Sequence, residues 1–311
     1  MANTLRSLIL AELSGPVDAA VTRMGEAVGQ RGRKPALGVL FYGSALRTGM
    51  RDGVLDFYVV VERLGDWHRS GIARLGNRLL PPNVEYHELV EEDRVMRAKV
   101  AILSLAQFRR LTGGGGLDAS VWARFAQPVA LVWSRDAAAR HAVAACVATA
   151  VCTAARWAAL LGPANGAALA FWQALFRCTY RSELRVEHSG RADELVEAAA
   201  ARYAALLPLA WSESGIEFSL DGAGNYAPHL PSAARSRAAT AWRWRRWLGH
   251  VLNALRLAKA AFTFNGGARY IAWKIRRHTG FDLGLTPWQE RHPLLAAPGV
   301  LWRLRRHGLL R

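Results

Sequence analysis

Short apolar runs and longer helical repeats alternate along the first 135 residues of the chain. Apolar runs bounded by glycine, proline and polar residues predict strands, whereas segments whose apolar residues recur every three or four positions predict helices. From residue 136 onward the helical repeat dominates. The pattern therefore predicts an α+β protein, in which a region of strands and helices comes first and an all-helical second domain follows.

The elements of the first region follow from these repeats. Gly15-Pro16 divides a helical stretch into two helices, because proline cannot continue a helix. Ser104 is suited to be the N-cap of a short helix. We expect helices at 3–30, 64–80 and 104–111, and strands at 36–42, 55–61, 84–88, 99–104 and 129–133.

The remainder of the chain is predicted to be helical, with one clear interruption. Leu220 to Pro231 contains two glycines and two prolines, which predicts a linker. Later, Thr286, Pro287 and Gln289 form the pattern of a helix start with a capping box. We therefore divide the chain into a first domain at 1–135, a helical domain at 136–230 and a C-terminal tail at 231–311.

The turn between the first two strands carries the most specific chemistry. Gly43 and Ser44 end one strand, and Asp56 lies near the start of the next. Glycine lets the backbone close on a triphosphate, and the serine hydroxyl and the turn amides can hold phosphate oxygens. A carboxylate on the adjacent strand can bind the Mg²⁺ that bridges those phosphates. A simple turn with a turn-forming Asp is the alternative interpretation.

Charge is concentrated in the C-terminal tail. The chain has a net charge of +17, and residues 235–311 contain sixteen Arg or Lys against two acids, so this quarter supplies +14. Half of the twelve tryptophans lie there as well. The basic character is thus a property of the tail and points to a polyanionic partner.

A helical wheel from Trp242 to Phe264 separates apolar from basic side chains. One face carries Trp244, Trp247, Leu248, Val251, Leu255, Ala258 and Phe262, and the rest carries Arg243, Arg245, Arg246, His250, Asn253, Arg256 and Lys259. A Trp/Leu face opposite an Arg face is typical of a helix lying in an anionic membrane interface. Binding of nucleic acid, or packing of the apolar face against the protein's own helical domain, are the alternatives.

The cysteines and the apolar runs bear on the cellular compartment and on whether the chain is expected to span a membrane. The three cysteines form no CxxC pattern, which favours buried thiols in a reducing compartment over a disulfide framework. The apolar run near the N-terminus is too short for a signal peptide, and the Ala-rich stretch at 142–155 is too short and too weakly apolar to be expected to span a bilayer.

Several blocks together resemble the mitochondrial-type phosphatidate cytidylyltransferases, the translocator-assembly-and-maintenance family of CDP-diacylglycerol synthases. Residues 42–44 are similar to that family's YGS, residues 55–57 to its LDF or IDL, and residues 67–68 to a Trp-His pair after the second strand. KVAILS at 99–104 is similar to a K-Y-G-V-I-S strand, ARFAQPV at 123–129 to G-R-L-Q-K-P-V, and YRSELRVE at 180–187 to a Tyr-containing segment. The resemblance covers roughly residues 36–200.

The resemblance implies a nucleotidyltransferase-type mixed sheet at 1–135 and transfer of CMP from CTP to phosphatidic acid with Mg²⁺ as cofactor. Gly43 and Ser44 would hold the β- and γ-phosphates, and Asp56 would bind Mg²⁺. Lys99 and Arg124 would neutralise charge on the triphosphate or the lipid phosphate. The remaining implied members of the nucleotide or lipid pocket are Tyr180 and Arg185.

The chain departs from the usual nucleotidyltransferase pattern at the second acid. Many such enzymes carry Asp-x-Asp, and the second position here is Tyr58. Glu62 has even spacing from Asp56 and would share its strand face if the strand extends that far, so it is the predicted second metal ligand. Asp52 and Glu85 are the other choices.

These observations lead to one main functional hypothesis with two alternatives. We expect a CTP:phosphatidate cytidylyltransferase that is peripheral on the inner (cytoplasmic) membrane at its cytoplasmic face; the mitochondrial inner membrane is less favoured. A nucleotidyltransferase acting on RNA or a soluble small molecule is the first alternative. A catalytically inactive binding protein with the same fold is the second.

Overall fold

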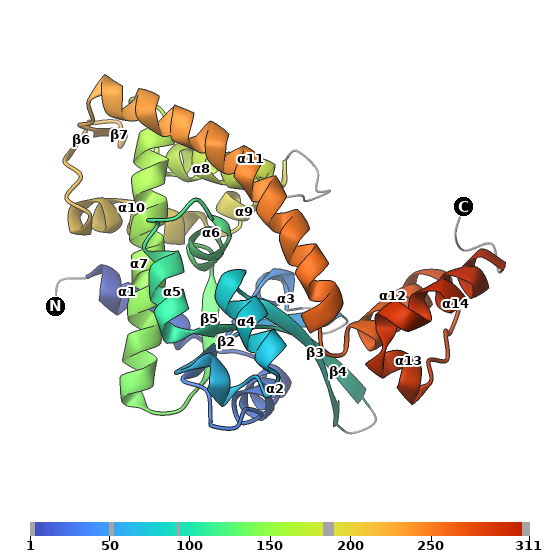
Figure 1. Ribbon diagram of the computed structural model, residues 1–311. Coiled ribbons are helices and arrows are strands. Elements are labelled where there is room, and N and C mark those ends of the chain that lie inside the picture. The colour runs from blue at the N-terminus through green and yellow to red at the C-terminus, as the bar shows by residue number, and fades with distance from the viewer. Residues whose placement is uncertain (1–3, 50–52, 92–93, 183–189, 307–311) are drawn as a thin grey trace.

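The computed structural model describes residues 4–49, 53–91, 94–182 and 190–306 and shows an α+β protein (Figure 1). Five strands form one mixed sheet in the order β3-β4-β2-β1-β5. Their bounds are β1 Gly38–Tyr42, β2 Val54–Val61, β3 Asn83–Glu91, β4 Arg94–Ser104 and β5 Val129–Ser134. All five predicted strands are therefore present.

The pairing within the sheet is mixed. Strand β1 lies antiparallel between β2 and β5, β2 is parallel to β4, and β3 is antiparallel to β4. Strands β3 and β4 are longer than expected and form a hairpin, because polar residues such as Glu88 and Arg97 continue the pairing beyond the apolar segments. The cross-strand pair Arg97–Glu88, with an N–O distance of 3.6 Å, occupies this polar part.

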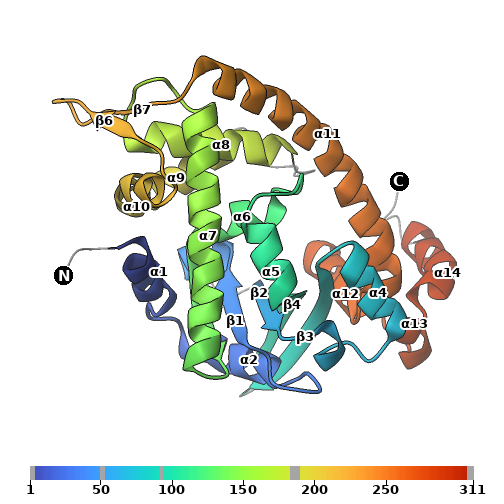
Figure 2. The same cartoon turned by 60° about the vertical axis from the view of Figure 1, so that its left-hand side comes forward.

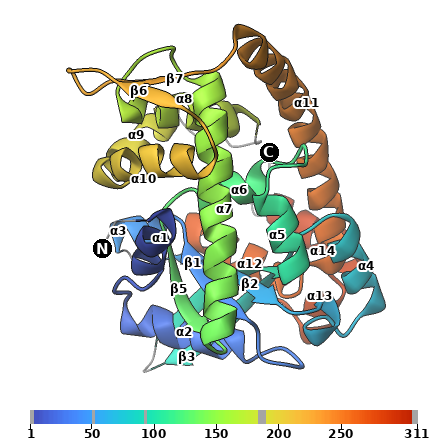
Figure 3. The same cartoon turned by 90° about the vertical axis from the view of Figure 1, so that its left-hand side faces the viewer.

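Helices cover both faces of the sheet. Helix α2 packs against one face, where Phe57 and Val100 are buried, and α1, α5, α6 and α7 cover the other, where Tyr42 and Tyr58 are buried (Figures 1 and 3). The helices of this region are α1 Leu5–Leu13, α2 Ala19–Gly29, α3 Ser44–Thr48, α4 Gly71–Leu79, α5 Leu105–Thr112 and α6 Ser120–Phe125, with a 3₁₀ turn, η1, at Leu64–Asp66.

Local sequence signals account for several of these boundaries. Ser104 caps α5 through a capping box with Gln107, as expected for a serine at the strand–helix junction. The helix predicted at 64–80 is instead a 3₁₀ turn followed by α4, which starts at the N-cap Ser70. The N-cap hydroxyl accepts a hydrogen bond from Ala73, so the helix begins there and not at Leu64.

Helix α7 is the central support of the second half of the molecule (Figure 3). The elements here are α7 Ala137–Leu161, α8 Ala168–Ser182, α9 Arg191–Glu197, α10 Ala200–Glu213, β6 Phe218–Leu220 and β7 Tyr226–Pro228. Helix α7 is long and apolar enough to cross a membrane by length and composition, but 67% of its most apolar window is buried within the protein. It serves here as a core helix.

The predicted linker at 220–231 is not an open connection. Strands β6 and β7 pair as a two-stranded hairpin, and the Tyr226 ring packs 6.2 Å from that of Trp211. Backbone hydrogen bonds between Tyr226 and Gly166 fix the hairpin to the loop before α8. Glycine and proline set the turns of this segment, but aromatic packing orders it.

The C-terminal tail forms four helices, α11 Ser232–Thr263, α12 Gly267–Thr279, α13 Pro287–Arg291 and α14 Pro293–Arg306. Helix α11 runs from the β6–β7 hairpin along α8 and α7 to the edge of the sheet, where α12 to α14 follow (Figures 1 and 2). The predicted break at 265–267 and the capping box of Thr286 with Gln289 are both confirmed.

The orientation of α11 differs from the alternative in which its whole apolar face packs against the helical domain. Trp242 is buried between Trp122 and Trp157, with ring centroids 6.1 and 5.2 Å away. The basic side chains then hold the helix against the protein: Lys259 Nζ donates to two backbone carbonyls of residues 80 and 82, and Arg256 binds Asp118. The predicted Trp/Leu face is left pointing outward.

Candidate active site at the β1–α3 turn

The candidate active site lies where β1 ends and the chain turns into α3. Gly43 adopts φ 96°, in the region that favours glycine, and a Cβ there would lie 3.0 Å from Asp56 Oδ2. The turn backbone thus passes directly over the carboxylate. Ser44 follows as the exposed first residue of α3. The structure brings together Gly43, Ser44 and Asp56, as expected from the sequence.

One row of residues crosses the whole sheet at this level. The register pairs Tyr42 with Asp56, Asp56 with Lys99, and Lys99 with Tyr86. Directly paired residues point to the same face, and neighbouring strands are about 4.8 Å apart. Lys99 therefore lies on the strand next to Asp56, on the same face.

An aromatic group supports this row and positions Arg124. The Arg124 guanidinium lies over the Tyr42 ring at 5.0 Å from its centroid. Tyr42, Tyr58 and Phe125 pack with one another at centroid distances of 5.0 to 6.5 Å. Stacking on an aromatic face fixes the orientation of a guanidinium without removing its charge. Helix α6 thus brings a second positive charge toward the row.

Helix α12 of the C-terminal tail forms the wall at the other end of the row. The Tyr270 ring packs 5.6 Å from that of Tyr86, and the Arg97 guanidinium lies 5.4 Å from the Trp273 centroid. Burial first, and the charge of Asp56 second, raise the pKa of Tyr270. Arg277 approaches Gly53, at the start of β2. Aromatic and basic residues of α12 therefore border the site.

The remaining predicted residues are placed differently. Tyr180 is half-buried in the last turn of α8, and both it and Arg47 of α3 contribute to the field at buried Tyr203, whose pKa is raised chiefly by burial. Arg185 lies outside the described residues, and so does Asp52.

Glu62 is not brought to Asp56. Strand β2 ends at Val61, and Glu62 follows it, so six residues separate the two carboxylates. At about 3.3 Å per residue this is about 20 Å, too far for a shared metal ion. Glu62 instead pairs with Arg135 at 3.3 Å. The expectation of a shared strand face required β2 to extend to Glu62, and the strand ends one residue before it.

Glu85 is on the opposite face and serves as a structural anchor. Its carboxylate accepts a hydrogen bond from Trp67 Nε1 at 3.0 Å and approaches His87 Nε2 at 3.1 Å and His68 Nδ1 at 3.6 Å. Burial would raise the pKa of Glu85, but hydrogen bonds from the two histidines and Trp67 outweigh it and lower the pKa to about 2. This carboxylate is thus engaged by side chains of the protein itself.

The protein offers few metal ligands at this turn, which suits a metal ion whose other ligands are nucleotide phosphates and waters. Among the described residues, no three His, Cys, Asp or Glu side chains are grouped to hold a metal ion. Mg²⁺ is usually bound through one or two carboxylates, with substrate phosphates and waters as further ligands. Asp56 can supply one such carboxylate beside the Gly43-Ser44 turn. The site therefore combines one acid, two nearby cations and a close backbone turn.

Comparison with known proteins identifies no relative: no protein-family model matches the chain, and no curated protein does. The site must therefore be judged by its own geometry. Sequence reasoning missed Tyr270 and Arg277, because they reach the sheet from a segment more than two hundred residues after Asp56. Their aromatic and basic types in the tail were the available signal, but nothing local indicated their destination.

Proposed function

We propose that this protein is a CTP:phosphatidate cytidylyltransferase that works at a membrane surface. The observation that carries the proposal is the close approach of the Gly43 turn to Asp56, with Lys99 beside it on the parallel strand. The order of strand, Gly-Ser turn and strand carboxylate is that of nucleotidyltransferase-type sheets. This arrangement supports binding of a triphosphate across the turn.

The proposed reaction needs charge neutralisation more than covalent catalysis. An oxygen of the phosphatidate phosphate attacks the α-phosphorus of CTP, a new P–O bond forms, and the bond to the β-phosphate oxygen breaks to release pyrophosphate. Ser44 and the turn amides would hold the β- and γ-phosphates. Lys99 and Arg124 would stabilise negative charge that develops on the phosphates in the transition state.

A Mg²⁺ ion fits this role through Asp56. The carboxylate would be its protein ligand, and the ion would supply Lewis-acid stabilisation of the leaving pyrophosphate. Tyr270 and Arg277 of α12 would border the side from which the second substrate approaches. The lipid phosphate is an anion, so a basic residue at that border would favour its approach.

The exposed face of α11 supports a membrane as the location of the reaction. Trp244, Trp247 and Phe262 are 61%, 60% and 75% exposed, although all three are large and apolar. Arg243 and Arg246 are exposed next to them. Apolar side chains with flanking arginines fit an anionic lipid surface, where each basic residue contributes about 1 kcal/mol.

The same orientation argues against a nucleic acid partner for α11. A helix that binds RNA would present its basic side chains to phosphates. Here Arg245 is buried and donates to the Gly116 carbonyl, and Arg256 and Lys259 bind partners inside the protein. The surface that α11 leaves open is mainly apolar, which favours lipid.

Release of pyrophosphate from CTP, with and without phosphatidic acid in vesicles, tests the proposal. Wild-type protein should require both phosphatidic acid and Mg²⁺. Asp56→Asn should lower the rate at least about a hundredfold, because it removes the carboxylate that lies against the Gly43 turn. Glu62→Gln is the matched control and should stay within about twofold of wild type. Full activity in Asp56→Asn would refute the mechanism.

One observation favours a second candidate, a nucleotide-binding protein without turnover. The residue paired with Asp56 on the parallel strand is Lys99, and residues 43–49, which form the turn and α3, contain no acid. Such a protein would bind CTP and vesicles but release no pyrophosphate. The turnover measurement above separates the two candidates.

A further inference from the structure

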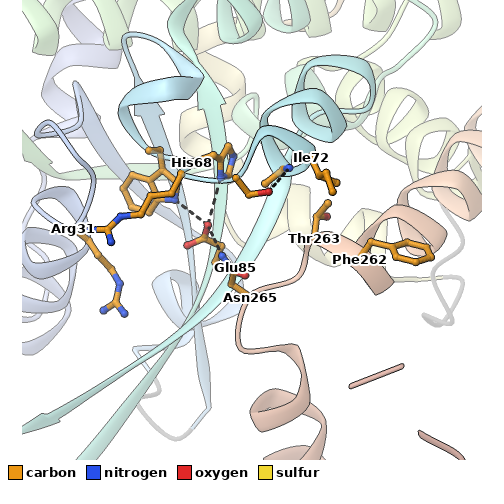
Figure 4. Close-up of a pocket in the computed structure, with 11 residues that line it drawn as sticks. Arg31, His68, Ile72, Glu85, Phe262, Thr263 and Asn265 are labelled. Atoms are coloured by element: carbon orange, nitrogen blue, oxygen red, sulfur yellow. Dashed lines mark hydrogen bonds and ion pairs between the residues drawn. The ribbon is translucent and has the colours of Figure 1, made fainter. Parts of the chain in front are cut away.

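A cavity of about 620 Å³ lies between α4, β3 and the end of α11, on the side of the sheet away from Asp56 (Figure 4). Its floor is Glu85, whose row on the sheet includes Val100 and Phe57. Both of these side chains are buried against α2, on the face opposite to Tyr42 and Tyr58. The cavity is therefore separate from the candidate active site.

The lining of the cavity is suited to an anion. Arg31 and Arg69 both line it and are exposed, and neither guanidinium is paired with a carboxylate in the described part of the chain. The one carboxylate in the lining, Glu85, accepts a hydrogen bond from Trp67 and lies beside His87 and His68. Two exposed cations thus border a cavity whose one carboxylate is already engaged by hydrogen-bond donors of the protein.

Helix α4 strengthens the anion preference. It begins at Gly71, directly after the lining residue Ser70, and is nine residues long. Backbone N–H groups of a first helical turn carry partial positive charge. The Ser70 hydroxyl accepts from Ala73, so the amides of Gly71 and Ile72 are not used by this cap.

One side of the cavity mouth is apolar, and this distinguishes a lipid from a soluble anion. Ile72 and Phe262 both line it and are 73% and 75% exposed. Figure 4 shows them together on one side of Glu85 and Arg31 on the other. The apolar surface continues along α4 through Leu75 and Leu79, 57% and 68% exposed, and along α11. A soluble phosphate would make no use of this surface.

We propose that this cavity binds the phosphate headgroup of an anionic glycerophospholipid, whose acyl chains lie over Ile72 and Phe262. The proposal rests on the membrane-facing orientation of α11 described under the proposed function. It adds a non-catalytic lipid site, on the opposite face of the sheet from Asp56. Its volume falls in the range of about 300–1,000 Å³ typical of small-molecule sites and exceeds what a bare phosphate needs.

Vesicle binding with two kinds of negative charge tests the site. Phosphatidylglycerol is chosen because it carries a phosphate but is not the proposed substrate, and oleate vesicles of equal surface charge lack phosphate. Wild-type protein should bind phosphatidylglycerol vesicles at least about fivefold more tightly than oleate vesicles. The double variant Arg31→Gln, Arg69→Gln should lose this preference, because the headgroup contacts are gone while the apolar surface remains.

The double variant Arg78→Gln, Arg243→Gln is the matched control. It also removes two positive charges, one from α4 and one from α11, but neither residue lines the cavity. It should weaken binding to both kinds of vesicle equally and keep the preference. Loss of the preference in this control, or its retention in the Arg31 and Arg69 variant, would overturn the proposal.

A soluble headgroup provides the last arm. Glycerol 3-phosphate lacks acyl chains, so it should not displace the wild-type protein from vesicles at millimolar concentration. Displacement would assign the cavity to a soluble anion and overturn the lipid assignment. A wild-type protein that binds no vesicles would overturn both the cavity proposal and membrane docking, whereas pyrophosphate release from CTP would still test the catalysis independently.

Discussion

Gly266 joins the C-terminal tail to the sheet, and its replacement by alanine is the most informative single change. Gly266 has φ 74°, and a Cβ there would lie 2.6 Å from the Tyr86 carbonyl oxygen. The preceding residue, Asn265, accepts a hydrogen bond of 2.8 Å from the Tyr86 N–H. The glycine therefore permits the close contact that fixes α12 beside the candidate active site.

The expected cost follows from these contacts. Left-handed backbone costs a residue with a Cβ about 1 kcal/mol. The atom in the way belongs to the backbone of β3, so the segment around Asn265 and Gly266 must shift away from the strand. Loss of the Tyr86–Asn265 hydrogen bond then costs about a further 1 kcal/mol. We expect Gly266→Ala to lower the free energy of unfolding by about 2–3 kcal/mol.

Gly280 offers a matched control within the same helix. It ends α12 with φ 73°, and a Cβ there would meet no atom within 4 Å. Gly280→Ala should therefore cost only the backbone strain of about 1 kcal/mol. Urea titration of both variants gives the difference. Equal destabilisation of the two variants would refute the inferred close contact.

The same pair of variants tests the role of α12 in the reaction. If Tyr270 and Arg277 border the site as described, displacement of α12 in Gly266→Ala should lower the rate of pyrophosphate release in folded protein. Gly280→Ala should keep its rate, because it leaves the contact between α12 and the sheet unchanged. An unchanged rate in Gly266→Ala would show that α12 is only a neighbour of the site.

Two further predictions concern the surface and the pH dependence. Trp244→Ser with Trp247→Ser should weaken vesicle binding and leave stability unchanged, whereas Trp242→Ala, at a site only 6% exposed, should cost roughly 3 kcal/mol by urea titration. The depressed pKa of Glu85, about 2 against 4.5, contributes stability that is full above pH 4.5 and is lost as pH falls toward 2. Acid titration of Glu85→Gln should therefore show a shallower decline over that range.

Local signals were enough to predict most elements of the fold. The N-cap residues Ser104 and Thr286 act on amides within the next three residues, so the sequence nearby contains all the necessary information. The break after Thr263 is likewise marked by two adjacent glycines. Interactions between residues close in the sequence can be predicted, because both partners lie in the same short segment.

The orientation of α11 could not be predicted in the same way. A helical wheel separates the Trp/Leu face from the basic face, but it does not show which face is covered. Lys259 faces inward because carbonyls of the Leu80–Pro82 turn accept its hydrogen bonds, and these residues are far away in the sequence. Buried cations are costly unless they are bonded, so only the folded arrangement reveals that partners exist.

The candidate site was predictable in part for a related reason. Gly43 and Asp56 are close in the sequence and lie on neighbouring strands, so their proximity followed from the turn. The pairing of Asp56 with Lys99 depends on the parallel register of β2 and β4, which joins residues more than forty positions apart in the sequence. The position of Tyr270 beside the site depends on the path of the entire tail.

The segment at Asn265, which lies against the edge of β3, also limits the pairing of this edge with another chain. Strand β3 is an edge strand, and its exposed backbone groups could pair with another chain. Asn265 forms a β-bridge beside Glu85 and occupies that edge. A chain cut before α11 would uncover this edge together with the Trp122 and Trp157 rings, so it would tend to self-associate. Point substitutions on the tail are therefore a safer way to dissect its function than its removal.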